Sequence, residues 1–351
     1  MRASIIIVGL NGIGYLEDCL SSLIPEINDD EIILVDNASS DGGPDFVGTH
    51  YPNVRLLRNA ENKGFAAACN QGAQIANGEI LVFLNQDTQV LAGWLTALLA
   101  SLHQSPMVGL TTSKLLLMSE PDQIHLCGQD IHFTGFSSGR GFQTPATSFC
   151  EPAAVAAVSG AAFAIRKDLW ERLGGFDEAF FMYYEETDLS WRAMLAGYHC
   201  LYVPASIALH DYHLGKPRWH ALYYSKRNRY LLLFKNWRLF TLVLISPALL
   251  LAELIDWLHC ILIGRLAIQA KWQAWTWVIS NYRSILYSRR KVQAARIHGD
   301  RRLLQVCTSS INPREFSGGL VGRLGAGLSN ALFELNYWFA NILLGRLARE
   351  D

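Results

Sequence analysis

The chain has 351 residues, of which half are hydrophobic and only 17% are charged. This length allows two domains, or one domain with a large appendage, and the composition is apolar for a soluble protein. Residues 1–210 hold 10 Lys and Arg against 23 Asp and Glu, whereas residues 211–351 hold 20 against 8. The acidic part must tolerate a ligand that brings its own cations, and the basic part suits an anionic surface.

Two features of the sequence bear on the compartment. The seven cysteines are scattered with no CxxC spacing, which argues against a zinc site and for free thiols in a reducing compartment. The sequence starts directly with a strand pattern instead of a signal peptide, so we expect that the chain is not exported by that route.

Short apolar runs alternate with helical spacing over the first 76 residues. Residues 4–8 and 31–35 are predicted strands, and the spacing of leucines after the first predicts a helix over 15–23. Residues 54–57 predict a shorter strand, and residues 65–76 predict a helix of small side chains. This alternation predicts an α/β fold with right-handed crossovers, a mostly parallel sheet and helices on both faces.

Residues 80–84 form the most apolar run and predict a buried central strand. The strand delivers Asn85 and Asp87 at its carboxyl end, where ligands sit in open α/β sheets. A carboxylate held there suits a divalent cation that bridges the phosphates of a ligand. On this stretch alone, a turn or a helix cap explains the two residues equally well.

The sequence lacks both common phosphate-binding fingerprints, because no GxGxxG follows the first strand and no Walker A motif is present. Instead, two strands end in acidic turns, at Asp36 and at Asp87. Asp36 and Asn37 are suited to the edge of a base or a ribose, and Lys63 to a phosphate.

The middle of the chain is less regular. Residues 93–103 predict a helix and residues 108–112 a strand, whereas residues 113–155 are predicted to be irregular and to face the acceptor. A strand over 158–166 carries small residues around Gly160, so its backbone is expected to approach a ligand closely.

Three acids, Glu185, Glu186 and Asp188, open a predicted helix between aromatic residues. A partly buried carboxylate with carboxylate neighbours has a raised pKa and suits a general base, although an ordinary acidic first turn gives the same pattern. A lone histidine is more often structural than a ligand, but His210 follows an apolar run, which raises the odds that it is a positioned ligand.

Seven segments in this order resemble family 2 glycosyltransferases of the GT-A fold, particularly bacterial rhamnosyltransferase-like members of envelope polysaccharide synthesis. The resemblance covers roughly residues 3–215 and implies a Rossmann-like domain that transfers a sugar, with inversion, from a nucleotide-diphosphate sugar. The segments are SIIIVGLN (4–11), ILVDNASSDG (33–42), NKGFAAACN (62–70), LNQDT (84–88), SGAA (159–162), GGFD (174–177) and YEETDLSWR (184–192).

The resemblance also implies roles for individual residues. Glu186 falls on the catalytic base, where the family usually has Asp, and Asn85 stands where many relatives have Asp. The implied catalytic residues are Glu186, Glu185 and Asp188; the nucleotide-sugar residues are Val8, Asp36, Asn37, Lys63, Asn70, Asn85 and Gly160; and the ligands for Mg²⁺ or Mn²⁺ are Asp87 and His210.

We expect a catalytic domain over 1–215 and a helical, membrane-associating region over 216–351. Residues 219–237 predict an interfacial helix, residues 239–264 a hairpin lying in one leaflet more readily than a span, and residues 328–344 a second amphipathic helix. The basic residues expected to meet anionic lipid are Lys226, Arg227, Arg229, Lys235, Arg265, Lys271 and the Arg289-Arg290-Lys291 cluster. A soluble helical domain or an oligomer interface is the alternative, and the apolar runs disfavour nucleic acid.

The leading interpretation is a glycosyltransferase bound peripherally or monotopically at the cytoplasmic face of the membrane, acting on a lipid-linked or cell-envelope glycan acceptor. A processive polysaccharide synthase is disfavoured, because Gly215 stands where a QxxRW motif ending in Arg218-Trp219 needs Gln. A non-catalytic protein that binds nucleotide sugar or lipid is the alternative from another class, supported only by the departures at Asn85 and Glu186.

Overall fold

The computed structural model of the chain describes residues 2–212, 219–311 and 319–347. The chain divides into two compact units, each described by itself below. The sheet unit comprises Met1–Gln129, Gly139–Ala193 and Tyr198–Leu214, and the helical unit comprises Asp130–Ser138, Met194–Gly197 and Gly215–Asp351. Residues 215 and 216, between which the sequence predicts a domain boundary, lie outside the described residues, as does Arg218 of the processive motif, whereas Trp219 is described.

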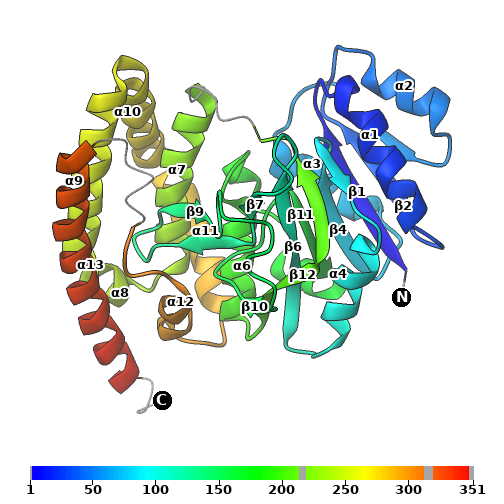
Figure 1. Cartoon of the computed structure of the whole chain (residues 1–351). Coiled ribbons are helices and arrows are strands. Elements are labelled where there is room, and N and C mark those ends of the chain that lie inside the picture. Colours follow the sequence, from blue (N-terminus) through cyan, green and yellow to red (C-terminus); the bar gives the residue numbers. More distant parts are fainter. Residues whose placement is uncertain (1, 213–218, 312–318, 348–351) are drawn as a thin grey trace. The chain divides into compact units, whose positions relative to one another are not determined.

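The sheet unit is built on four parallel strands in the order β4-β1-β2-β3 (Figure 1). These strands are the apolar runs of the sequence, and their side chains alternate between two covered faces. Their bounds are β1 Ala3–Gly9, β2 Glu31–Asp36, β3 Arg55–Arg58 and β4 Ile80–Asn85.

Beyond β4 the sheet becomes mixed. Strand β11 (Ala162–Arg166) lies antiparallel between β4 and β6 (Val108–Leu117), and β12 (His199–His210) runs parallel to β6. The α/β fold class is therefore confirmed, with antiparallel strands added to a parallel nucleus. The remaining strands are β5 Thr88–Val90 and β10 Ala153–Ala154 on β12, β7 Ile124–Leu126 on β6, and the pair β8 Gln129–Ile131 and β9 Ser137–Gly139.

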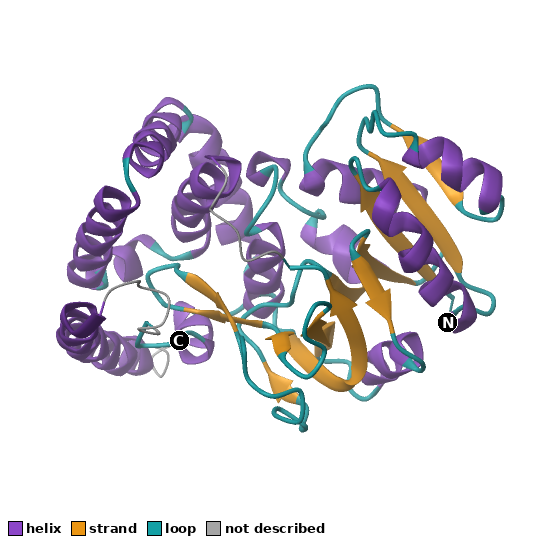
Figure 2. Cartoon of the chain, turned by 45° about the horizontal axis from the view of Figure 1, so that its top comes forward, coloured by secondary structure: helices purple, strands orange, loops and turns teal. Residues whose placement is uncertain are grey.

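Helices cover both faces of the sheet (Figure 2). One face packs α1 (Ile13–Leu23), α2 (Gly43–His50) and α4 (Trp94–His103) against side chains such as Ile5 and Val82. The other face holds α3 (Phe65–Ile75) against Ile6 and Val35, where Gly72 lets the helix approach closely. Helices α5 (Lys167–Leu173) and α6 (Glu185–Leu195) and the 3₁₀ turns Ile24–Glu26 and Glu178–Phe180 complete the layers.

The structure corrects the prediction that residues 113–155 are irregular. Strand β6 continues to Leu117, and β7, β8, β9 and β10 also lie in this stretch. The long strand β12 has an irregularity between Val203 and Ile207. Pro204 lies in that irregularity, where its missing N–H costs no ladder hydrogen bond.

The helical unit is built from successive helices of the basic part of the chain. Helix α9 alone among the described residues is long and apolar enough to cross a membrane by length and composition. The helices are α7 Trp219–Asn236, α8 Leu239–Leu244, α9 Ser246–Ile263, α10 Arg265–Ser280, α11 Tyr282–Ala295, α12 Asp300–Val306 and α13 Gly319–Leu347.

A buried ionic cluster joins α7, α9 and α10. The carboxylate of Asp256 lies 2.6 Å from Lys226 Nζ and also bonds Lys271, whose Nζ is 2.6 Å from Glu253. Arg229 pairs with Glu253 at 3.5 Å, and Tyr230 donates to the same carboxylate.

The cluster corrects part of the lipid-binding prediction. The cations of α7, which are Lys226, Arg227, Arg229 and Lys235, are all buried, and so is Lys271 of α10. The segment 219–237 is therefore not an interfacial helix that offers its charges to lipid.

Candidate active site

The loops that follow β1, β2 and β4 are tied together at the carboxyl edge of the sheet. The Gln86 amide receives a hydrogen bond from Leu10 N at 3.1 Å and donates to Leu10 O at 3.2 Å. Asn11 Oδ1 accepts from Ser40 N at 2.8 Å. A Cβ on Gly12 would lie only 2.1 Å from Gln86, so this packing requires glycine. The edge is thus a rigid rim, and no pattern in the sequence indicated the part that Gln86 plays in it.

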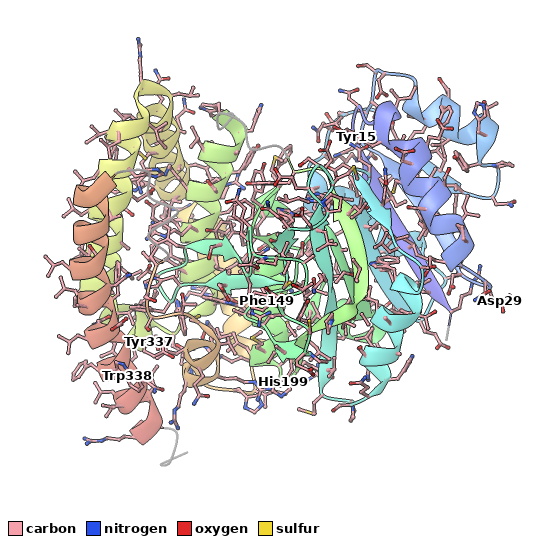
Figure 3. The ribbon with its side chains drawn as sticks, in the orientation of Figure 1. Tyr15, Asp29, Phe149, His199, Tyr337 and Trp338 are labelled. Carbon is pink, nitrogen blue, oxygen red and sulfur yellow. The ribbon has the colours of Figure 1, made fainter. Side chains whose placement is uncertain are left out.

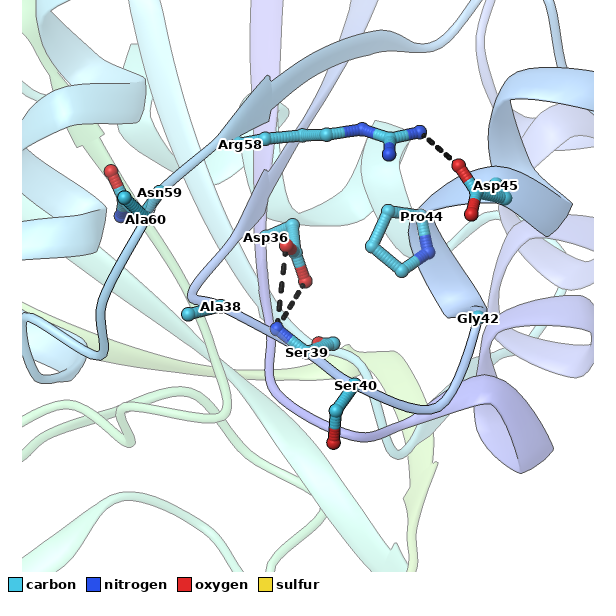
Figure 4. A pocket seen from close by; sticks show the side chains of 10 residues that line it. All are labelled: Asp36, Ala38, Ser39, Ser40, Gly42, Pro44, Asp45, Arg58, Asn59 and Ala60. Atoms are coloured by element: carbon cyan, nitrogen blue, oxygen red, sulfur yellow. Dashed lines mark hydrogen bonds and ion pairs between the residues drawn. The ribbon is translucent and has the colours of Figure 1, made fainter.

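A cavity of about 530 Å³ opens beside Asp36 at this rim (Figure 4). The buried Asp36 carboxylate accepts from Ser39 N at 3.2 Å, and Arg58 pairs with Asp45 at 2.8 Å on the opposite wall. The volume and the mixture of acceptors and donors suit a nucleobase with its sugar. The other lining residues are Ala38, Ser40, Gly42, Pro44, Asn59 and Ala60.

Asn37 does not contribute a free amide to this cavity, contrary to the prediction from the sequence. Its Nδ2 donates to Asn62 Oδ1 and Gly64 O, and its Oδ1 accepts from Lys63 N and Asn59 Nδ2. With both ends of the amide satisfied, Asn37 holds the loop 59–64 in place. The Lys63 side chain on that loop is exposed, as a phosphate-facing cation requires.

Asn70 is likewise a structural residue rather than a nucleotide-sugar contact. Its Nδ2 donates to Phe176 O and to Glu178, each at 3.0 Å, and its Oδ1 accepts from Phe176 N. It therefore fixes the GGFD turn before α6. Val8 pairs in register with Val35 and with Asn85, so it lies at the same carboxyl edge as Asp36.

Asp87 and His210 meet at this edge because β5, which follows Asp87, pairs with the end of β12. His210 Nε2 lies 3.4 Å from Asp87 Oδ1. Both atoms are buried and, among the described residues, have no hydrogen-bond partner. Two orphaned acceptors of this kind fit a divalent cation that takes its remaining ligands from phosphate and water.

His125 packs against the ring of His210. The two rings stack with centroids 4.8 Å apart, their Nδ1 atoms are 3.0 Å apart, and Tyr212 stacks on the other side of His125. Burial, with a contribution from His210, lowers the pKa of His125 to about 3, so this ring is neutral. Among the described residues no group of three or more His, Cys, Asp or Glu could hold a metal ion.

The acidic start of α6 is buried. Glu185 and Glu186 are 4% and 7% exposed, and Gln129 Nε2 donates to Glu186 Oε1 at 2.5 Å. Burial raises the pKa of Glu186, and burial together with the charge of Glu186 raises the pKa of Glu185 well above its ordinary value. A carboxylate with a raised pKa suits the removal of a proton from a hydroxyl group.

Asp188 differs from its two neighbours. It is fully buried and accepts from Arg192 Nε at 2.7 Å, while the same guanidinium donates to Leu173 O and Gly175 O. Asp188 therefore anchors α6 to the preceding turn through Oδ2, and the catalytic role that the resemblance implies for it stays a prediction.

Short connections link the acidic helix start to the Asp87 edge. Asn85 N donates to Ala161 O at 2.9 Å, because β11 runs antiparallel to β4 and its leading turn meets the end of β4. Gly160, next in that turn, is adjacent to Glu186: a Cβ built on it would lie 3.7 Å from Glu186 Oε2. Glu186, Gly160, Asn85 and Asp87 thus follow one another along one edge of the sheet.

Similarity to solved structures agrees with this architecture. GalNAc-T7 with UDP, GalNAc and Mn²⁺ matches with a TM-score of 0.58 and 20% identity, covering 71% of this chain and 51% of that one. TarS 1–349 of S. aureus in complex with UDP matches with a TM-score of 0.53 and 14% identity, covering 96% and 91%. At these identities the likeness establishes the fold, which is the GT-A fold.

Similarity in sequence identifies the family, which similarity of fold does not. Residues 4–173 match the family described as Glycosyl transferase family 2, and the chain belongs to this enzyme family. Over 204 residues it is 29% identical to the N-acetylglucosaminyl-diphospho-decaprenol L-rhamnosyltransferase of Mycobacterium tuberculosis. It is 28% identical over 202 residues to the pre-mycofactocin glycosyltransferase of the same organism.

These relatives are matched only in part. The alignment covers 51% of this chain and 66% of the rhamnosyltransferase, and 57% of this chain and 41% of the pre-mycofactocin enzyme. The similarity therefore concerns the sheet unit for the most part, and the helical unit is described from its own structure.

Proposed function

We propose that the protein transfers a hexosyl or deoxyhexosyl group, with inversion, from a nucleotide-diphosphate sugar to a hydroxyl group of a lipid-linked or cell-envelope glycan. The observation that carries the proposal is the shared sheet edge, on which a buried carboxylate pair and an unpartnered carboxylate–imidazole pair lie on either side of Gly160. A proton acceptor and a cation site at one edge are what a displacement at a sugar phosphate requires.

The reaction follows from the roles of these groups. Glu186 takes the proton of the acceptor hydroxyl, whose oxygen attacks the anomeric carbon on the face opposite to the diphosphate. The new carbon–oxygen bond forms as the bond to the diphosphate breaks, and the nucleoside diphosphate leaves with the bonding electrons. Asp87 and His210 would hold Mg²⁺ or Mn²⁺, which would supply electrostatic stabilisation to the departing diphosphate.

The cavity beside Asp36 is the proposed site of the nucleoside. Its carboxylate and the Arg58 guanidinium offer an acceptor and donors on opposite walls, and the exposed Lys63 offers a point charge to the diphosphate. The presence of UDP in both solved relatives described above supports a nucleoside diphosphate as the ligand class.

The helical unit is the proposed membrane-binding part, at the cytoplasmic face. On α9 the side chains of Leu250, Leu254, Leu258 and Leu262 are all more than half exposed and recur every four residues. On helix α13 the side chain of Trp338, labelled in Figure 3, is also exposed, as are those of Leu328, Leu335 and Phe339. An exposed apolar stripe of this size needs a covering surface, and a lipid leaflet with anionic headgroups for Arg290 and Lys291 fits it.

The same helices favour lying in the interface over spanning. On α9, Glu253 and Asp256 pair with Lys271 and Lys226 inside the unit. A span would have to give up these pairs and carry two carboxylates through hydrocarbon, which is costly. The polyprenol-linked substrate named for the mycobacterial rhamnosyltransferase supports an acceptor that resides in the membrane.

The test uses the full chain with vesicles and Mn²⁺. Melting temperatures are measured with UDP-, dTDP- and GDP-sugars, because a ligand that binds the folded state raises the melting temperature. The donor that gives the largest rise is then incubated with a polyprenyl-diphosphate-linked sugar, and free nucleoside diphosphate and glycosylated lipid are measured. Both products should appear in equal amounts. Donor binding without product from any lipid-linked or glycan acceptor would instead favour the non-catalytic binding protein.

A further inference from the structure

We infer that Gln129 is a positioning residue that selects Glu186, rather than Glu185, as the charged member of the buried carboxylate pair, and that Thr187 fixes the direction of the Gln129 amide. The inference rests on the proposed function for its catalytic meaning. Gln129 lies in the stretch 113–155, in which the sequence predicted no individual site residue.

The contacts define the direction of the amide. Gln129 Nε2 donates to Glu186 Oε1 at 2.5 Å, and Gln129 Oε1 accepts from Thr187 Oγ1 at 3.1 Å. The Thr187 hydroxyl is fully buried on α6, one residue after Glu186. The backbone of Gln129 is fixed as well, because its N–H donates to Ala157 O at 2.9 Å. A hydroxyl donor at one end of the amide therefore leaves the NH₂ group for Glu186.

This direction decides where the charge resides. Two carboxylates buried side by side do not both ionise, because each negative charge raises the pKa of the other. A donor directed at one of them stabilises its charged form. Glu186 receives that donor, whereas Glu185 Oε2 is buried with no hydrogen-bond partner. The proton of the pair therefore resides on Glu185, and Glu186 remains free to accept one.

The surrounding groups do not supply this selection. Cys69 of α3 lies near both glutamates and is a buried thiol. Asp188 of α6 is neutralised by Arg192 at 2.7 Å. Gln129 is a donor from outside the pair that bonds Glu186, and Glu185, when protonated, donates to the same carboxylate.

The remaining oxygen of Glu186 is placed for the reaction. Gln129 occupies Oε1, and Oε2 faces Gly160, where a Cβ would still be 3.7 Å away. The absence of a side chain at Gly160 leaves room beside Oε2 for the hydroxyl that loses its proton. Gln129 thus fixes both the charge and the orientation of the proposed base.

Two variants with a matched control test the inference. Gln129→Leu removes the donor at similar volume, and Thr187→Val removes the hydroxyl that directs the amide, whereas Thr187→Ser keeps it. The first readout is a ¹³C NMR titration of full-length protein with [5-¹³C]glutamate, assigned with Glu185→Gln and Glu186→Gln. The second readout is the pH dependence of donor turnover.

In Gln129→Leu the loss of the donor should raise the pKa of Glu186 by about one pH unit. A base must be deprotonated to act, so the acid limb of kcat should move to higher pH by the same amount. Thr187→Val should shift both in the same direction by less, and Thr187→Ser should match the wild-type protein. A merely structural role would lower the melting temperature and leave the Glu186 titration unchanged, which would overturn the inference.

The readouts separate this inference from the proposed function. If the wild-type protein turns over no donor, the proposed function fails while the glutamate titration still decides the inference. If Gln129→Leu does not fold, Thr187→Val and Thr187→Ser decide it, and equal Glu186 pKa values in those two proteins would overturn it.

Discussion

The two units differ in how their buried carboxylates are paired. In the helical unit, Asp256 and Glu253 are surrounded by Lys226, Lys271 and Arg229, and the carboxylates are paired. In the sheet unit, Asp87 Oδ1, His210 Nε2 and Glu185 Oε2 are buried and have no hydrogen-bond partner among the described residues. Burial of an unpaired carboxylate costs free energy, so the carboxylates at the sheet edge suit a ligand or a reaction that pairs them.

This difference indicates which buried groups stabilise the fold and which are available to a substrate. The paired cluster ties α7, α9 and α10 together and has no free atom to offer a substrate. The unpaired groups lie where the strand ends leave space. A change in the sheet edge should therefore affect the reaction with little loss of stability, and a change in the helical cluster should do the reverse.

The largest effect on the reaction is expected at Glu186. Glu186→Gln keeps the size of the side chain and removes the base, so kcat should fall about 10²- to 10⁴-fold. Donor binding, measured by calorimetry with Mn²⁺, should remain. The exposed Glu171→Gln on α5 is the control and should keep the wild-type rate. Turnover of Glu186→Gln at the wild-type rate would refute the assignment of the base.

The largest effect on stability is expected at Asp256. Asp256→Ala leaves Lys226 and Lys271 buried with less negative charge, so the free energy of unfolding should fall by about 3–5 kcal/mol. Chemical denaturation measures it, with the exposed Glu334→Gln of α13 as the control. A loss below about 1 kcal/mol would show that the cluster does not hold the helices together.

The pH dependence of the free energy of unfolding is a second test of the role of Asp256. Burial opposes the charge of Asp256, but Lys226, Lys271 and Arg229 overcome it and lower its pKa to about 2. A depressed folded-state pKa means that the stabilisation is present above about pH 4 and is lost as the pH falls towards 2. Asp256→Ala should lack this part of the acid-induced loss of stability.

The exposed apolar face should affect membrane binding more than stability. Replacing Leu254 and Leu258 of α9 with Glu removes two side chains whose burial in lipid contributes about 1.5–3 kcal/mol each. Flotation with phosphatidylglycerol vesicles should show release of the protein, while the melting temperature changes little. The matched control replaces Leu91 and Met107, which are exposed on the sheet unit, with Glu. Equal release of both double variants would refute the membrane face.

The smallest effect is expected at the cation site. Asp87→Ala should weaken nucleoside diphosphate binding by about tenfold with Mn²⁺ present, or about 1.4 kcal/mol, and leave binding without metal unchanged. Calorimetry with and without Mn²⁺ measures this difference. Asp29→Ala, an exposed acid labelled in Figure 3, is the control. A metal-independent loss of binding would mean that Asp87 holds the nucleotide by another route.

The parallel nucleus of the fold was predictable because its strands are uninterrupted apolar runs that need both faces covered. Strands β1, β2 and β4 appear within one or two residues of their predicted bounds. The short strands of residues 113–155 were not predictable, because β7 to β10 have two or three residues each. Strands of that length carry too little periodicity and depend on tertiary pairing.

Some residues of the candidate site could also be predicted from the sequence, and others could not. The positions of Asp87, His210 and Glu186 could be predicted because each follows or begins a strongly patterned element, and their roles stay predictions. Asn37, Asn70 and Asp188 make side-chain hydrogen bonds within the protein that the sequence does not reveal. Gln129 and His125 lie in short strands without a pattern, and only the assembled sheet brings them to Glu186 and His210.

The position of β12 within the sheet limits how the chain can be shortened. Residues 4–173, the part that matches the family, end before β12, which hydrogen-bonds along β6 and carries His210. A fragment trimmed to those residues would keep β11 beside β6, would leave the other side of β6 without its partner strand, and would lack Glu186 and His210. Such a bare strand edge pairs with other chains, so the minimal catalytic piece must extend past residue 210 to avoid self-association.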